Sequence, residues 1–445
     1  MPQRRSTHLP VLLCFLWAGA GLAAEDAASP PSAADAAEPP PEGTSTIAPA
    51  ALPAGVPSLQ MSTDYGSPFT ALGGYRPMGE PQGGAIRVEP FTVRAAVQAG
   101  IGYNDNVRLS GADKTASMFL TMSPSVSVGL DNEAQRYYAV YRGNYGNYFS
   151  SSADDFTEHN LGLSAANEWS TRLRTLVRYE HVRTQNSRGS TTATVAAPER
   201  WRVNAIRASA SYGAAGAPGR IEASAAYIDQ KYLDNRAATA ARDYDQVEVG
   251  GTFYWRVAPK TQALTEIRRS EITHDADRTL DSTEMRYLVG ARWEATARTS
   301  ATVRAGYLTR DFSSSIRPDF GGLTYEAAAT WTPLSYSSVS LGAIRTTREP
   351  VETGSAFVLD HLFSVEWTHA WSDRVRSMAT YLYGNQEHEG LGRTETLHAI
   401  GLRASYGFHR NLRFGAEFRH DSRSSPVPLL DYKRNITLMT VEASL

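Results

Sequence analysis

Cysteine and lysine are scarce in this sequence of 445 residues. Lysine occurs only at Lys114, Lys231, Lys260 and Lys433, and the one cysteine is Cys14. Because Cys14 lies in an apolar N-terminal run that we expect to be removed, the mature chain has no thiol. This excludes disulfides, cysteine-based metal sites and a cysteine nucleophile. The 44 basic and 46 acidic residues nearly cancel, which argues against nucleic acid as a partner.

Long apolar runs are also lacking. Beyond residue 24, no stretch approaches the roughly 18 consecutive apolar residues of a transmembrane helix. At the N-terminus, two arginines precede an apolar run over residues 9–22, which small residues follow. This pattern predicts a secretory signal peptide over residues 1–24, cleaved after Ala23 or Ala24. The alternative, a short membrane anchor, needs a longer run.

The next segment, residues 25–89, is rich in alanine, proline, glycine and serine. Such a composition cannot bury enough apolar surface to fold alone. We therefore expect a disordered periplasmic leader. A tether or partner-binding tail is the alternative interpretation of the same segment.

Residues 90–445 alternate between apolar and polar side chains. Tyr287, Val289 and Ala291 share one parity, for example, whereas Arg286 and Arg292 share the other. A period of two is typical of a strand with one apolar and one polar face, and about 9–11 tilted residues cross a bilayer. We count eighteen candidate strands, which begin near Phe91, Ala116, Gln135, Thr157, Thr171, Arg202, Gly219, Tyr244, Thr261, Thr283, Thr299, Gly322, Ser337, Leu359, Arg374, Thr396, Asn411 and Tyr432.

Connections between these strands alternate in length. Those after even-numbered strands are very short, such as residues 131–133 and 372–373, whereas those after odd-numbered strands are longer and polar, such as THDADRTLDS (273–282). Short turns at one end and long loops at the other are typical of transmembrane barrels. The fold class predicted is all-β: a single antiparallel up-and-down transmembrane β-barrel of about 18 strands (16–18).

Aromatic residues close the strands that precede the short turns. Amphipathic rings collect at membrane–water interfaces, where barrels carry aromatic girdles. The predicted membrane girdle at the short-turn end consists of Trp169, Tyr212, Trp255, Trp293, Trp331, Trp371 and Phe408. Candidates for the opposite girdle are Tyr103, Tyr227, Tyr307, Tyr381 and Phe418.

The two faces of each strand can be assigned. Backbone groups in lipid need internal partners, so strands span a bilayer only as a closed barrel. Placing an arginine on the lipid face costs roughly 2–4 kcal/mol at mid-depth, so the parity of Val289 should face lipid and that of Arg286 the interior. His361 and His369 share the apolar parity of their strand, near its ends, where headgroups or water could contact them. A β-propeller or solenoid would need short strands and a repeated motif, and neither is found.

The interior-facing charges are the candidate pore lining. Barrels of 16–18 strands are wide enough for an aqueous channel. Both signs occur in similar numbers, which predicts a polar conduit without strong ion selectivity; pairing within the wall is the alternative role. The predicted pore-lining residues are Arg178, Arg207, Glu248, Arg286, Arg292, Arg304, Glu326, Glu366, Arg403, Arg413 and Glu417, with Glu222 and Glu284 on the same wall.

Catalytic and metal-binding patterns are weak. His420, Asp421 and Ser422 are adjacent on a strand, so their side chains alternate between faces and cannot form a relay. The segment GAAGAPGR (213–220) joins two strands and opens no helix, which indicates a turn rather than a phosphate loop. Acidic clusters at 154–155 and 274–277 could hold Ca²⁺, but we expect solvated loops. We therefore predict no metal, no cofactor and no enzymatic activity.

Several stretches resemble a known family. They are GYNDNV (102–107), RDY (242–244), residues 282–312, SSVSLGAIRTTRE (337–349) and the closing YKRNITLMTVEASL (432–445). They resemble the putative beta-barrel porin 2 family of Gram-negative outer-membrane proteins, over essentially all of residues 91–445. Some members are associated with exopolysaccharide biosynthesis and export, so the resemblance implies a barrel that acts with an export apparatus. One departure is Leu445, which stands where many outer-membrane barrels end in an aromatic residue.

Three hypotheses describe the function of the protein. The first is an outer-membrane channel that assists export of an extracellular polysaccharide; a general solute porin is its close alternative. The second is a structural barrel or assembly platform without transport, and the third, an outer-membrane hydrolase, lacks a clustered catalytic set. Expected partners are outer-membrane lipid and lipopolysaccharide, the barrel-assembly machinery, periplasmic polysaccharide export proteins and the transported polymer.

Overall fold

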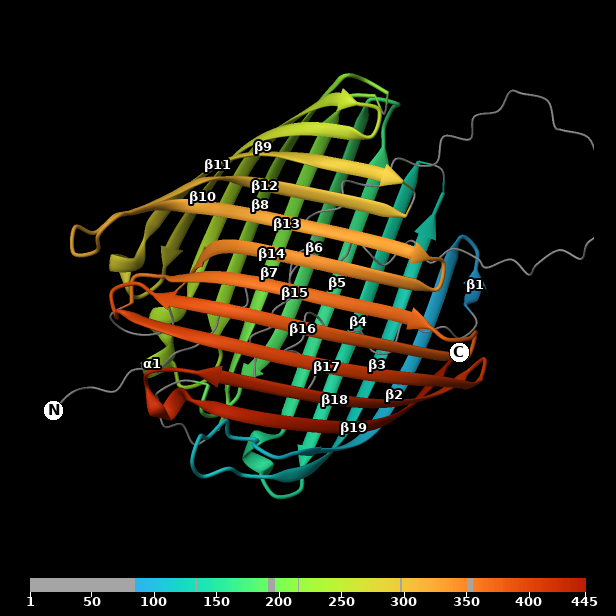
Figure 1. The fold of residues 1–445 in the computed structure, drawn as a ribbon, viewed down its shortest axis with the longest axis vertical. Coiled ribbons are helices and arrows are strands. Elements are labelled where there is room, and N and C mark those ends of the chain that lie inside the picture. Colours follow the sequence, from blue (N-terminus) through green and yellow to red (C-terminus); the bar gives the residue numbers. More distant parts are fainter. Residues whose placement is uncertain (1–84, 133, 191–196, 215, 297, 350–354) are drawn as a thin grey trace, which may run out of the picture.

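Eighteen antiparallel strands close into one barrel in the computed structural model (Figure 1). The structure describes residues 85–132, 134–190, 197–214, 216–296, 298–349 and 355–445. β19 pairs with β2 from Ile436↔Asn104 to Ser444↔Ala96, and this closes the barrel. A short strand, β1, pairs with the start of β2 from Ile86↔Val93 to Val88↔Phe91. The predicted fold class and the count of eighteen barrel strands are confirmed.

The strand bounds lie close to the starts expected from the alternation. They are β1 (Ile86–Val88), β2 (Phe91–Asn104), β3 (Ser117–Asp131), β4 (Gln135–Tyr148), β5 (Phe156–Glu168), β6 (Leu173–Asn186), β7 (Glu199–Tyr212), β8 (Gly219–Tyr232), β9 (Tyr244–Ala258), β10 (Thr261–His274), β11 (Ser282–Thr296), β12 (Thr299–Phe312), β13 (Phe320–Leu334), β14 (Ser337–Arg348), β15 (Val358–Ala370), β16 (Val375–His388), β17 (Arg393–His409), β18 (Leu412–Ser424) and β19 (Tyr432–Ser444).

In the part of the chain that the structure describes, helices occur only in the long connections. They are η2 (Ser152–Asp154), α1 (Arg236–Thr239), η3 (Ala240–Arg242), η4 (Arg278–Leu280) and η5 (Pro428–Leu430). In Figure 1, α1 lies at the end of the barrel opposite to the C-terminus. Within the described ranges, no helix is long and apolar enough to cross a membrane.

One connection is shorter than the alternating pattern predicts. Between β16 and β17, only residues 389–392 (EGLG) join the strands, although this turn lies at the long-loop end. Gly390 and Gly392 have φ values of 87° and 59°. Glycine reaches positive φ without steric cost, so this segment can turn tightly where the other connections at this end are longer.

Burial alternates along the strands as the sequence pattern predicts. Val289 on β11 is 62% exposed, whereas Leu288 beside it is 1% exposed. The same alternation appears in the strands around the barrel, with large apolar side chains exposed on the outer parity. An apolar belt of this kind faces lipid in a transmembrane barrel, while the inner face is polar.

The two histidines on the apolar parity of β15 lie near opposite ends of that strand. Arg345 Nε donates to His361 Nε2 at 3.0 Å, and Glu387 lies 3.6 Å from the same nitrogen. The His369 ring packs against Trp367 and Trp371, with ring centroids 5.5 and 4.4 Å away. Each histidine therefore contacts polar or aromatic side chains near one end of the barrel, away from the middle of the strand.

Candidate pore and its charged wall

The predicted pore-lining residues all lie on the inner parity of their strands, opposite the exposed apolar face. Arg286, Arg304 and Glu326 meet in one network, described below. Arg403 and Glu417 form an ion pair at 2.9 Å, and Arg178 lies directly opposite Arg207. The others are distributed around the wall: Glu248 accepts from Ser270 at 3.0 Å, Arg292 pairs with Glu294 at 2.6 Å, Arg413 with Glu442 at 3.5 Å, and Glu366 lies on β15. Their role as a pore lining stays a prediction.

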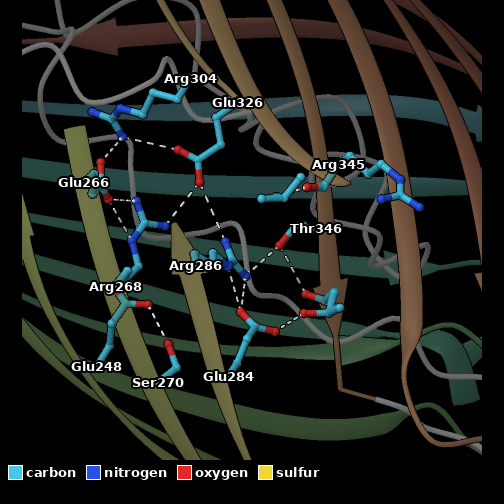
Figure 2. Close-up of polar contacts among 12 residues, drawn as sticks. Glu248, Glu266, Arg268, Ser270, Glu284, Arg286, Arg304, Glu326, Arg345 and Thr346 are labelled. Carbon is cyan, nitrogen blue, oxygen red and sulfur yellow. Dashed lines mark hydrogen bonds and ion pairs between the residues drawn. The ribbon is translucent and has the colours of Figure 1, made fainter. Parts of the chain in front are cut away.

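A buried ionic network covers the inner wall of β10–β13 (Figure 2). Glu326 is its centre: Arg268, Arg304 and Arg286 approach its carboxylate at 3.1, 3.2 and 3.6 Å. Glu266 contacts Arg268 and lies 3.4 Å from Arg304. Each strand contributes one or two of these charges, because inner positions recur at every second residue.

The network extends toward the long-loop end of the barrel. Arg286 Nε donates to Glu284 at 2.7 Å, and Arg286 Nη2 donates to Thr346 Oγ1 on β14 at 2.8 Å. The Thr347 hydroxyl donates to the same glutamate. Burying a charge without a partner is costly. The paired arginines and glutamates neutralise each other, and this holds their side chains in place on the wall. Pairing within the wall, the alternative raised from sequence, describes this sector well.

Sequence reasoning missed Arg268 and Glu266. Both stand in TQALTEIRRSEITH (261–274), on the parity opposite to Ala263, Thr265 and Ile267. The same period-of-two rule that selected Arg286 would have selected them. The contact between Arg268 on β10 and Glu326 on β13 could not be predicted, since it depends on the curvature of the closed wall.

The connection between β2 and β3, residues 105–116, turns into the barrel. Leu109 at its tip is fully buried, with φ at 51°, in a cluster with apolar residues of the inner wall. That cluster consists of Leu109, Ile344, Leu362, Leu382, Leu397, Ala399 and Tyr432, from β14–β17 and β19. We call residues 105–116 the inward loop. The cluster includes Tyr432 on β19, the neighbour of β2, and residues of β14–β17, so the loop folds inward against the wall on that side of the barrel.

Hydrogen bonds hold the inward loop in place. Asn106 Nδ2 donates to Ser110 O at 2.8 Å and to Lys433 O at 3.0 Å, and Asn106 Oδ1 accepts from Ser110 N at 2.9 Å. Val107 N donates to Thr115 O at 2.8 Å. The pattern DNVRLSGADK contains one leucine among polar residues, a signal too weak to predict an inward fold.

A second loop contacts the inward loop from the other side. Arg423 on β18 donates from Nη1 to Ser190 O at 3.0 Å and from Nη2 to Gly189 O at 3.1 Å. A Cβ atom at Gly189 would lie 2.0 Å from Arg108 O, so the two loops touch there. Arg423 itself is 1% exposed. The long-loop half of the lumen is therefore filled by loop backbone and by side chains of the wall.

The short-turn half of the inner wall is more open. On β8, the inner residues Ala226, Ile228, Gln230 and Tyr232 are buried toward the long loops. Toward the short turns, Ser224 on the same inner face is exposed and Arg220 and Glu222 are partly exposed. The same gradient recurs on β16, where Leu382, Gly384, Gln386 and His388 are buried and Met378 and Thr380 are not. We call the more exposed short-turn part of the inner wall at β8 and β16 the vestibule; on β19, Thr440 and Glu442 remain buried up to the short-turn end.

The residues considered as possible catalytic or metal-binding sites contact other residues of the protein. His420 Nδ1 bonds Asn435 at 2.8 Å on the outer face, whereas Asp421 points inward to Arg419 and Arg434, so the expected separation is present. Asp154 is buried against Arg188 rather than solvated, and Asp155 Oδ1 accepts the backbone N–H of Tyr148 at 2.7 Å. Among the described residues, no group of three or more His, Cys, Asp or Glu side chains could hold a metal ion. Of the segment 213–220, residues 219 and 220 begin β8 and the residues before them join β7 to β8. The signal peptide and most of the leader, through residue 84, lie outside the described residues.

Two carboxylates in the β8–β9 loop have shifted pKa values. Burial raises the pKa of Asp243, although Tyr232 N donates to it at 2.8 Å and Arg236 pairs with it at 2.6 Å. The hydrogen bond from Arg200 lowers the pKa of Asp234. These interactions fasten the loop to the ends of β7 and β8.

A closed barrel with an apolar outer belt and a charged inner wall is an outer-membrane porin-like fold. The chain belongs to the putative beta-barrel porin 2 family, whose model matches residues 76–445. This confirms the family that the sequence resembles. None of the curated proteins searched matches the chain.

Several solved structures are similar to the chain at low sequence identity. The FrpB iron transporter from Neisseria meningitidis (F5-1 variant) aligns with a TM-score of 0.42 and 12% identity, over 76% of this chain and 64% of that one. OccAB2 of Acinetobacter baumannii gives 0.44 and 11%, over 80% and 98%, and OccK2 of Pseudomonas aeruginosa 0.43 and 10%, over 81% and 99%. The chain spans less than two thirds of the length of the FrpB chains.

Proposed function

We propose that this protein is an outer-membrane channel that assists the export of an extracellular polysaccharide. The observation that carries the proposal is a closed barrel whose inner wall is polar and charged and is more exposed in the vestibule at the short-turn end. The polymer comes from the family resemblance, since some members are associated with exopolysaccharide export. Short turns face the periplasm in bacterial barrels, so the vestibule would receive a chain delivered from that side.

The wall suits a hydrated polymer that is moved without chemistry on the sugar. The charged side chains of β10–β13 form ion pairs with one another, which fixes their positions. A polymer in the lumen would therefore meet paired groups that can form hydrogen bonds, and not isolated charges. Transport requires contacts that are weak and repeated, because a tight site would stop the chain. Entry to the cell surface would need the inward loop to move off its cluster around Leu109.

Partners follow from this proposal. The barrel-assembly machinery would insert the protein, lipopolysaccharide and phospholipid would surround its apolar belt, and periplasmic polysaccharide export proteins would deliver the polymer. The leader would remain in the periplasm after removal of the signal peptide, on the side of the vestibule. None of these steps needs a cofactor.

A deletion strain tests the export role. We expect loss of the gene to lower the amount of secreted polysaccharide while the polymer accumulates in the periplasm, because the last crossing is removed. The measurement is polymer in the medium and in a periplasmic fraction, with the gene restored on a plasmid as control. Unchanged secretion in the deletion strain would discard the export role.

A structural barrel or assembly platform is the second candidate, and one observation favours it. The inward loop and Arg423 fill the long-loop half of the lumen. Planar-bilayer recording of the purified protein separates the two: a platform shows no stable open level under any applied voltage, whereas a channel opens. A general solute porin would pass current and leave polymer secretion unchanged in the deletion strain.

A further inference from the structure

Arginines on the inner wall of β6–β8 differ from those of the ionic network. Arg178 on β6 lies directly opposite Arg207 on β7 in the strand register. Like charges placed directly opposite each other destabilise a sheet. Among the described residues, no carboxylate lies within ion-pair distance of Arg178, and its buried Nε has no hydrogen-bond partner.

The ionic network also contains two arginines directly opposite each other, but there carboxylates neutralise them. Arg268 lies opposite Arg286 in the register of β10 and β11. There, Glu266, Glu284 and Glu326 neutralise the two guanidinium groups at ion-pair distances. The contrast shows that this fold can satisfy opposed arginines with the chain's own carboxylates, and that it does not do so at Arg178.

Further polar atoms without a protein partner lie on the inner wall of the same three strands, toward the short turns. On β8, Arg220 has buried Nε and Nη2 atoms without hydrogen-bond partners, and its Cζ lies 4.1 Å from the centroid of the Tyr254 ring. Ser211 Oγ and Glu222 Oε2 are buried and unpartnered in the same sector. Buried polar groups in folded proteins are normally hydrogen-bonded. Exceptions also occur elsewhere on the wall, such as Arg304 Nε and Glu266 Oε2, but on β6–β8 they occur together with an arginine that has no counter-charge at ion-pair distance in the described part of the chain, which points to an external partner.

We define the basic wall patch as Arg174, Arg178, Arg207 and Arg220, with Ser209, Ser211 and Ser224 between them. Its inner face also carries Glu180 and Glu222, and Glu248 on β9 lies across Ala226 from Arg207, so four arginines stand against three glutamates and the local charge is 4 − 3 = +1. The patch lies in the short-turn half of the lumen, where Ser224 is exposed. It therefore faces the vestibule rather than the filled half.

We propose that the basic wall patch binds a negatively charged segment of the transported polysaccharide, through carboxylates of the uronate type. The guanidinium fork matches a carboxylate in two parallel hydrogen bonds, and the serine hydroxyls between the arginines suit sugar hydroxyls. The proposal rests on the export function and names its substrate class. Near-equal numbers of both signs around the wall predicted weak ion selectivity, but this sector is locally positive.

Arg178→Gln tests the patch with little effect on folding, because no protein carboxylate or carbonyl depends on Arg178. The probes are trigalacturonate, galacturonate and maltotriose, applied from the short-turn side of a planar bilayer during current recording and also titrated into detergent-solubilised protein by calorimetry. We expect trigalacturonate to bind the unchanged protein and to bind the variant about tenfold more weakly, as for loss of one charge-assisted hydrogen-bonding group. The unfolding midpoint of the variant should stay equal or rise, since the opposed pair is removed.

Arg403→Gln is the matched control. It removes a partly buried inner-wall arginine that is paired with Glu417 at 2.9 Å, so its unfolding midpoint should fall while trigalacturonate affinity is retained. Equal affinity of the unchanged protein and Arg178→Gln for trigalacturonate would overturn the proposal. So would binding of maltotriose as tight as that of trigalacturonate, or of galacturonate as tight as the trimer.

The two proposals fail in different experiments. Loss of the binding difference refutes the patch but leaves polymer secretion by the cell untouched. Unchanged secretion in the deletion strain refutes export but leaves uronate binding by the purified protein as measured. The pair of results therefore shows which statement is wrong.

Discussion

Leu109→Asp is expected to raise the single-channel conductance of the purified protein several-fold in a planar bilayer. Leu109 is fully buried in the apolar cluster of β14–β17 and β19, and burying an unpaired carboxylate there costs several kcal/mol. The wall strands are held by continuous cross-strand ladders, whereas the inward loop is held by separate hydrogen bonds, such as that from Asn106 to Lys433 O. We therefore expect the inward loop to leave the apolar cluster, which widens the lumen.

The matched control is Ile316→Asp. Ile316 lies in the β12–β13 connection and is 80% exposed, so an added carboxylate stays in water and the conductance should match that of the unchanged protein. A rise with both variants would indicate a general charge effect at the barrel mouth. Unchanged conductance with Leu109→Asp would show that the inward loop does not limit the path.

Glu326→Gln is expected to lower the free energy of unfolding by about 3–5 kcal/mol, the range for breaking a buried ion pair. The Glu326 carboxylate lies within 3.6 Å of Arg268, Arg286 and Arg304. Its loss leaves three guanidinium groups with too few counter-charges on one wall. Urea unfolding in lipid vesicles, followed by the mobility shift of folded barrel on a gel, measures the change.

Glu271→Gln is the control for this prediction. Glu271 faces outward on β10 and lies 3.9 Å from Arg269, with side-chain exposures of 64% and 55%. Exposed pairs contribute about 0–1 kcal/mol, so the unfolding midpoint should barely move. Equal destabilisation by the two variants would mean that the network around Glu326 carries no special stability.

Periodicity made most of the fold predictable. Fourteen of the eighteen barrel strands begin within one residue of the expected start; β2, β4 and β8, for example, begin at Phe91, Gln135 and Gly219. Strand parity is a local property, so one strand is enough to assign its two faces. The turn at 389–392 departed from the loop pattern because two glycines at positive φ permit a hairpin there.

The filled half of the lumen was not predictable. It depends on contacts between Leu109 and strands more than 200 residues further along the chain, such as Leu362 and Leu397. The sequence pattern assigns a side chain to the inside or the outside, but it does not state how deeply a loop enters. The same limit applies to Arg178 and Arg207, whose opposition follows from register and not from either strand alone.

The membrane girdle at the short-turn end stays a prediction. Trp169, Trp371 and Phe408 are each more than 60% exposed beside the short turns. Trp367 stacks edge-on against Trp371, which continues the aromatic surface onto β15. Ring exposure of this kind next to a charged turn is typical of an interfacial position.

A cysteine scan of β8 tests the central claim, that one strand parity contacts lipid while the other faces water. The predicted mature chain has no cysteine, so single cysteines at Ile221, Glu222, Ala223, Ser224 and Ala225 give clean labelling sites. In lipid vesicles, positions 222 and 224 should react with a charged thiol reagent, whereas labels at 221, 223 and 225 should be quenched by a bilayer-dissolved quencher. Uniform reactivity along the strand, or the reverse parity, would contradict the account.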